Sequence, residues 1–264
     1  MRIILAALGL ALSCCTLPTA TLAADGLYEQ IRDLSRLSDP ISFASERPVQ
    51  GAPAELTEDE QEVIDLFLPM THLVSNAGMN FKVVVVTDDS GDESPVVTSY
   101  LFGTCSLVVQ LRGNTLYPVL MGSHDPYRRR TKLRAILAHE IGHCFEYTEA
   151  DRTAIVQGKK GLSPTDTRSE ADRHEDEVRA DLFALAWAAV YNPKEFDAVY
   201  GYLRELRLEL FPNLPGYATG EELAQGLEFR PATGAASPSL LKDVATTPAS
   251  IPGLSRRWCF RRLC

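Results

Sequence analysis

The stretch Ala138–Glu146, which reads AHEIGHCFE, decides how this chain is interpreted because it contains the pattern H-E-x-x-H. Residues 127–147 are predicted to form a helix with an apolar stripe that would be buried in a core. Residues four apart lie on one face of a helix, so His139 and His143 can aim their imidazoles at one metal ion. Glu140 would lie beside that ion and take a proton from a bound water molecule.

A second predicted helix, at residues 173–189, supplies a carboxylate. Glu177 and Asp181 are four apart and lie beside its apolar face. A buried carboxylate is costly unless it is paired or bound to metal. We therefore predict Glu177 as the third metal ligand, with His174 and Glu175 as alternatives. Asp181 is expected to accept a hydrogen bond from the free N–H of a ligating histidine. Two imidazoles, a carboxylate and an open fourth position favour Zn²⁺.

The two motifs together resemble those of a known enzyme family. HEIGH followed by Glu177-Val178-Arg179-Ala180-Asp181 resembles the gluzincin metallopeptidases, whose pattern is H-E-x-x-H with a later E-x-x-x-D. The motif E-x-x-A-D is similar in particular to that of the M48-type and ImmA/IrrE-type peptidases. The resemblance covers residues 133–189 and implies a zincin-like α+β fold. In such a fold a small mixed sheet packs on the HExxH helix, and a ligand-bearing helix follows.

The expected reaction is zinc-dependent hydrolysis of a peptide bond by a metal-activated water, with Glu140 as the general base. Two alternatives stay open. One is a catalytically weak zincin-like module that binds a protein partner. The other is a secreted effector protease with a single target protein. The residues carry no indication of the oligomeric state.

Residues 1–23 are predicted to be a secretory signal peptide. They contain one Arg, an apolar run and small residues before Ala24. The run is too short for a membrane span and is broken by Pro18. A lipoprotein signal ending at Cys14 is the alternative, but the residues before it fit a lipid box poorly. We therefore expect an exported protein, periplasmic or secreted, with no stable membrane insertion after signal removal.

The charge of the chain bears on its partners. Removal of the signal peptide takes away one Arg, so the formal net charge changes from -9 to -10. An acidic protein is a poor partner for nucleic acid or anionic lipid. A peptide or protein substrate is expected instead.

Four cysteines remain after the predicted cleavage: Cys105, Cys144, Cys259 and Cys264. Export permits disulfides, and an even number suggests two. Cys105 with Cys144 would tie the predicted sheet to the HExxH helix, and Cys259 with Cys264 would close a small C-terminal loop. Three pairings are possible, and the sequence does not choose among them.

We divide the chain into the signal peptide (1–23), an N-terminal helix and loop (24–56), a zincin-like catalytic domain (57–211) and a Pro-rich C-terminal extension (212–264). In the N-terminal part, residues 25–37 are predicted to be helical and residues 38–53 a loop. The extension is expected to be loosely ordered, with one short helix near residues 221–227.

The catalytic domain is predicted to begin with a helix from Glu58, for which Thr57 and Glu60 form a capping box. Strands are predicted at residues 81–87, 95–102, 105–111 and 115–121. The last would be an edge strand or carry a bulge, because Pro118 cannot donate to a ladder. An edge strand, either 105–111 or 115–121, could hold an extended peptide beside the metal by β-augmentation. A third helix is predicted at residues 194–210.

Overall fold

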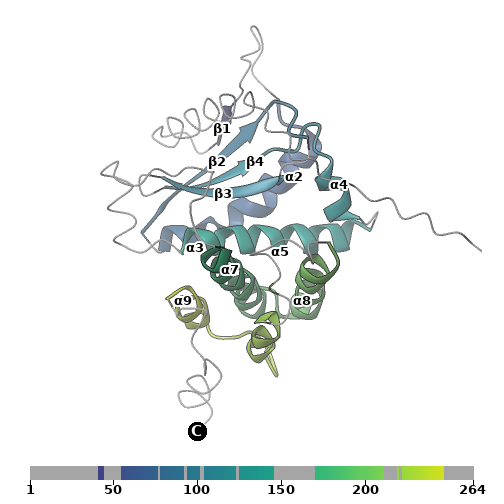
Figure 1. Ribbon diagram of the computed structural model, residues 1–264. Helices are drawn as coiled ribbons and strands as arrows, with labels where there is room; N and C mark the ends of the chain where they lie inside the picture. Colours follow the sequence, from purple (N-terminus) through teal and green to yellow (C-terminus); the bar gives the residue numbers. More distant parts are fainter. Residues whose placement is uncertain are drawn as a thin grey trace, which may run out of the picture.

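The computed structural model describes residues 41–44, 55–76, 78–91, 94–101, 104–122, 125–145, 170–210, 219 and 222–246. These residues form a mixed α+β fold, which confirms the predicted class. Figure 1 shows the long helix α5 (Pro126–Cys144) between two layers. The sheet covers one side of α5, while α7 (Glu170–Tyr191) and α8 (Phe196–Glu205) cover the other.

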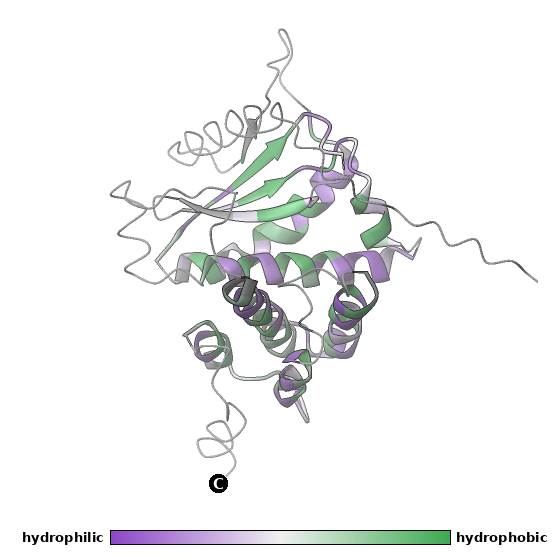
Figure 2. Ribbon diagram, viewed as in Figure 1, coloured by the Kyte–Doolittle hydropathy of each residue, from purple (hydrophilic) through white to green (hydrophobic). Residues whose placement is uncertain are grey.

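The sheet has four strands in the order β1-β2-β4-β3. They are β1 (Ile41–Ala44), β2 (Asn80–Val86), β3 (Val96–Leu101) and β4 (Thr104–Val109). The first, second and fourth are parallel, whereas β3 runs antiparallel to β4. Figure 2 shows that β2 and β4 are largely hydrophobic. Their apolar runs suit strands that are buried on both faces.

The prediction of the edge strand was wrong in both of its alternatives. The predicted strand at residues 105–111 corresponds to β4 (Thr104–Val109). This strand pairs with β2 on one side and β3 on the other, and all of its residues are buried. The described edges of the sheet are therefore β1 and β3. Of these, β3 is the strand that contacts α5.

The second alternative, a strand at residues 115–121, is corrected because Leu116–Met121 form a helix. Helix α4 spans Leu116–Met121 and ends at Gly122, whose φ of 50° is the left-handed conformation that glycine adopts easily. Pro118 lies in the first turn, where a missing N–H removes no helical bond. Asn114 Oδ1 accepts from the Tyr117 N–H at 2.8 Å and so satisfies a donor at the start of the helix.

The predicted loop at residues 38–53 contains a strand, which is a further correction. Strand β1 pairs in parallel with β2, and Ile41 lies opposite Val83. The segment Ile-Ser-Phe-Ala is too short to show alternation, so its strand conformation depends on pairing with β2.

Helix α2, which lies between β1 and β2 in the chain, agrees with the prediction of a capped helix from Glu58. Helix α2 (Glu58–Phe67) begins at the capping box, in which Thr57 N–H donates to Glu60 Oε2 at 2.8 Å and Glu60 N–H donates to Thr57 Oγ1 at 3.2 Å. A single 3₁₀ turn, η1 (Leu68–Met70), contains Pro69 and leads into α3 (Thr71–Asn76).

The third helix, predicted at residues 194–210, is divided into three shorter helical segments in the structure. A 3₁₀ turn, η2 (Pro193–Glu195), precedes α8, and a π-helical turn, η3 (Leu206–Leu210), follows it. Beyond residue 211 the structure has η4 (Glu222–Phe229), where one short helix was expected, and also α9 (Ser239–Thr246). Both pack against α7, and their buried hydrophobic side chains belong to the main core. The expectation of loose order is therefore wrong for this described part.

The predicted signal peptide, the predicted helix at residues 25–37, and Cys259 and Cys264 lie outside the described residues. Within the described ranges, no helix combines the length and apolar character needed to cross a membrane.

Candidate metal centre

Helix α5 presents the H-E-x-x-H motif at the junction of the two layers. The helix begins at Asp125, whose side chain accepts from Tyr127 N–H, and its N1 residue is Pro126. His139, Glu140 and His143 offer ligand atoms that all lie within 4.8 Å of one another, so this group could hold a metal ion. His139 is 7% exposed and His143 is partly buried.

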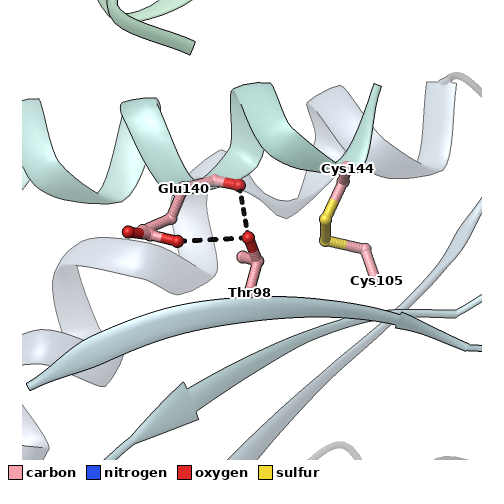
Figure 3. The surroundings of a disulfide bond; sticks show 4 residues. All are labelled: Thr98, Cys105, Glu140 and Cys144. Carbon is pink, nitrogen blue, oxygen red and sulfur yellow. Dashed lines mark hydrogen bonds between the residues drawn. A yellow bond between two sulfur atoms is a disulfide. The ribbon is translucent and has the colours of Figure 1, made fainter. Parts of the chain in front are cut away.

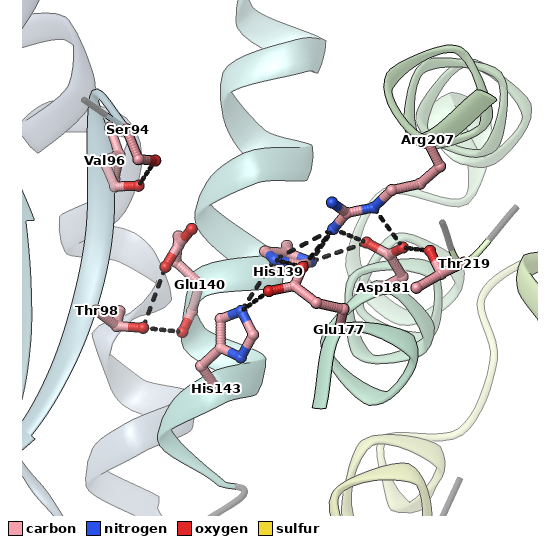
Figure 4. Close-up of polar contacts among 10 residues, drawn as sticks. All are labelled: Ser94, Val96, Thr98, His139, Glu140, His143, Glu177, Asp181, Arg207 and Thr219. Carbon is pink, nitrogen blue, oxygen red and sulfur yellow. Dashed lines mark hydrogen bonds and ion pairs between the residues drawn. The ribbon is translucent and has the colours of Figure 1, made fainter. Parts of the chain in front are cut away.

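Glu177 of α7 lies close to both imidazoles of the motif. The Nε2 atoms of His139 and His143 are 3.0 Å apart, and Glu177 oxygens lie 3.4 Å from the first and 3.6 Å from the second. Ligand atoms bound about 2.0–2.1 Å from one tetrahedral zinc ion are about 3.3 Å apart. The three side chains therefore have the spacing of ligands to one ion, and Figure 4 shows them converging.

Asp181 has the position predicted for it, beside a histidine of the motif. Its Oδ1 lies 2.8 Å from His139 Nδ1. A carboxylate only accepts, so Nδ1 carries the proton and donates it. In the neutral imidazole, Nε2 then presents its lone pair toward His143 and Glu177.

Arg207 is a member of the site that the sequence analysis missed. It comes from η3, is 3% exposed, and donates to Glu177 Oε2 at 2.8 Å and to both oxygens of Asp181 at 2.9 Å. Thr219 Oγ1 also donates to Asp181 Oδ2, at 2.6 Å. Asp181 therefore has three donors, which is how a fully buried carboxylate is stabilised.

A signal for Arg207 existed in the sequence. It follows Val199 and Leu203 at intervals of four, so it lies on the apolar face of the predicted third helix. An arginine on such a face needs a buried anionic partner. Thr219, in contrast, lies in a segment without periodicity, and no pattern pointed to it.

These contacts set the charges in the site. Burial by itself would raise the pKa of Glu177, but in the metal-free protein a hydrogen bond from protonated His139 and the positive charges of His143, His139 and Arg207 lower it to about 2. Burial likewise opposes ionisation of Asp181, and the Arg207 guanidinium keeps the pKa of Asp181 well below its usual range. Both carboxylates are therefore ionised near neutral pH, as a metal ligand and its hydrogen-bonding partner require.

Glu140 lies in a different environment from Glu177. Its carboxylate is on the side of α5 that faces β3, where Thr98 Oγ1 lies 3.1 Å from Oε2 (Figures 3 and 4). Burial raises the pKa of Glu140, and the nearby charges of His143 and His139 oppose that rise. A carboxylate with a raised pKa is suited to accept a proton and release it again.

The two alternative ligands, His174 and Glu175, contact residues outside the motif. His174 Nε2 is 3.1 Å from Glu222 of η4, and Glu175 accepts from Arg179 at 3.1 Å. Of the three candidate ligands, Glu177 is therefore the one that contacts both histidines of the motif.

A disulfide joins Cys105 of β4 to Cys144, the residue directly after His143. It is one of the pairings that the sequence left open. Both cysteines are fully buried. The bond ties the sheet to the end of α5 that carries the motif (Figure 3).

Comparison with known proteins gave no relative: no family model, no curated protein and no solved structure matches this chain.

Proposed function

We propose that this protein is a zinc-dependent peptidase of gluzincin type. The observation that carries the proposal is the convergence of His139, His143 and Glu177, whose ligand atoms are 3.0 to 3.6 Å apart, with Glu140 within 4.8 Å of the two histidines. When bound there, zinc would lower the pKa of a water molecule and polarise the carbonyl of a peptide bond.

Residues of the chain would transfer the proton and hold the metal ligands in position. Glu140 accepts the proton of the attacking water and returns it to the leaving amine. Asp181 keeps His139 in the tautomer whose Nε2 lone pair is available, and Arg207 holds Asp181 and Glu177 in place. The edge strand β3 lies along α5 and offers backbone groups to an extended peptide.

The arrangement of the layers also supports the proposal. A small mixed sheet lies on the motif helix, and α7 brings the carboxylate from the opposite layer. The resemblance to the gluzincins implies a small mixed sheet on the motif helix and a later ligand-bearing helix, so these features support the proposal. The disulfide supports export, since disulfides persist in oxidising compartments.

Metal analysis of purified protein tests the centre. We expect about one zinc per chain in the wild type and a large loss in Glu177→Ala. Glu175→Ala is the matched control, because it removes a carboxylate from the same helix that bonds to Arg179 instead. Equal zinc content in wild type and Glu177→Ala would contradict the assignment of Glu177.

Peptide cleavage by the zinc-loaded protein tests the activity. Cleavage of a broad peptide library is expected for the wild type, and Glu140→Gln should retain zinc while losing activity. If the wild type binds zinc and cleaves nothing in the library or among whole proteins, the chain is a zinc-binding module. Cleavage of a single protein only would indicate a narrow effector protease.

A further inference from the structure

The geometry points to Thr98 as a positioning residue for Glu140, an inference that rests on the proposed peptidase function. The Thr98 hydroxyl lies 2.9 Å from the backbone oxygen of Glu140 and 3.1 Å from its Oε2. A hydroxyl rotates to donate to either acceptor. Its single proton serves one of these two oxygens at a time, so one side chain from the sheet lies within hydrogen-bonding reach of both the backbone and the carboxylate of Glu140.

Thr98 is itself held rigidly. It lies in β3 and pairs with Leu107 of β4, so its backbone position is fixed by the sheet. Its β-branched side chain has few χ1 rotamers. Paired residues project from the same face of a sheet, and buried Leu107 belongs to the main core that also includes residues of α5. The hydroxyl is thus directed at α5 by the sheet and not by a loop.

The Cys105–Cys144 disulfide and the Thr98–Glu140 contact are separated by similar distances along the sheet and along α5. From Cys105 to Leu107 along β4 is about 7 Å, since a strand rises about 3.4 Å per residue. From Cys144 back to Glu140 along α5 is about 6 Å, at 1.5 Å per residue. The Cys105–Cys144 bond and the Thr98–Glu140 contacts are therefore two successive links between sheet and helix (Figure 3). The disulfide limits sliding of α5, and Thr98 limits rotation of the carboxylate.

The Glu140 carboxylate lies within 4.8 Å of the ligand atoms of His139 and His143, but it approaches them from the side of the sheet. Figure 4 shows His139 and His143 directed toward α7, with the Glu140 carboxylate on the side of β3. A general base works only when its oxygen is held within hydrogen-bonding reach of the proton that it removes. Without the Thr98 donor, the carboxylate would occupy other rotamers for part of the time. Thr98 should therefore affect the chemical step more than substrate binding.

The test compares zinc-loaded Thr98→Val and Thr98→Ser with wild type on a peptide that the wild type cleaves. We expect Thr98→Val to keep its zinc and its KM within about twofold, while kcat falls about tenfold. Thr98→Ser should restore most of kcat, because it returns the hydroxyl. In a Glu140→Gln background, Thr98→Val should cause no further loss, since Thr98 acts through the Glu140 carboxylate. Thr115→Val is the control, because its hydroxyl bonds to the Gly91 backbone oxygen.

The outcomes separate this inference from the proposed function. An unchanged kcat, a loss of zinc in Thr98→Val, or an equal loss in the Glu140→Gln background would overturn the positioning role and leave the peptidase proposal standing. A zinc-loaded wild type without peptidase activity would overturn both, and it would be detected before any variant is compared.

Discussion

Arg207 shows how much one side chain contributes to this centre. Its guanidinium is nearly inaccessible and pairs with two buried carboxylates, Glu177 and Asp181. Burial disfavours the charged guanidinium, but Asp181 and Glu177 more than compensate and raise the pKa of Arg207 above its ordinary value. Removal of one member of such a cluster leaves unpaired charges in a medium of low polarity.

We therefore expect Arg207→Met to lower the free energy of unfolding of the metal-free protein by about 3–5 kcal/mol. Zinc should restore part of this loss, because a divalent cation replaces the missing positive charge beside the carboxylates. Urea unfolding with a chelator and with zinc measures both effects. Arg204→Met is the control, since Arg204 is exposed on the preceding turn and should change stability by less than about 0.5 kcal/mol. A metal-free Arg207→Met protein as stable as wild type would contradict the prediction.

Tyr117 gives a prediction about pH. Burial raises the pKa of Tyr117 from 10.0 to about 12, against the opposing charge of Arg129. A group whose pKa is raised on folding contributes stability below its unfolded pKa, and this is lost as the pH rises toward the folded pKa. Between pH 10 and 12, the wild type should therefore lose about 2–3 kcal/mol that Tyr117→Phe does not lose. Urea unfolding across this range measures the difference. Tyr127→Phe, which replaces a tyrosine that is 58% exposed, should follow the wild type.

At the scale of elements, the centre depends on how closely α5 approaches α7. Gly142 lies between the two histidines of the motif, at the contact of the two helices. A Cβ at this position would lie 2.8 Å from Ala180 Cα and 3.1 Å from Phe183 Cβ. The glycine therefore allows the close approach through which Glu177 reaches the histidines.

Gly142→Ala should separate these helices, although alanine favours a helix over glycine. We expect a loss of about 1–3 kcal/mol in the free energy of unfolding, and weaker zinc binding because Glu177 moves away from the histidines. Chemical denaturation and zinc titration measure these effects. Gly201→Ala in α8 is the control, because nothing lies within 4 Å of the added carbon. That variant should gain up to about 1 kcal/mol with unchanged zinc affinity. If both variants behave alike, the close approach is not what requires glycine at position 142.

At the scale of the whole molecule, the disulfide joins the sheet to the helical layer across 39 residues of sequence. Closing a loop of this size stabilises the folded state by about 4 kcal/mol, by restricting the unfolded chain. We expect that loss in Cys105→Ala/Cys144→Ala, measured by urea unfolding in a Cys259→Ser/Cys264→Ser background. The parent protein here is the Cys259→Ser/Cys264→Ser variant. Reductant should lower its stability toward that of the variant that also lacks Cys105 and Cys144, and should leave the latter unchanged. A parent protein that resists urea equally well with and without reductant would contradict this.

The sequence by itself determined the parts of this protein that depend on local periodicity. The pairs His139 with His143 and Glu177 with Asp181 are each four residues apart, so a helix alone places each pair on one face. The capping box at Thr57 and the main strands follow from equally local patterns. Only the tertiary structure decided which strand forms the edge, that Leu116–Met121 are helical, that Arg207 contacts Glu177 and Asp181, and that Thr98 contacts Glu140. The edge depends on strand pairing, and the contacts of Arg207 and Thr98 join segments 26 to 42 residues apart. Periodicity marks Arg207 as a buried residue but does not identify its partner, and it gives no sign of the Thr98 contact.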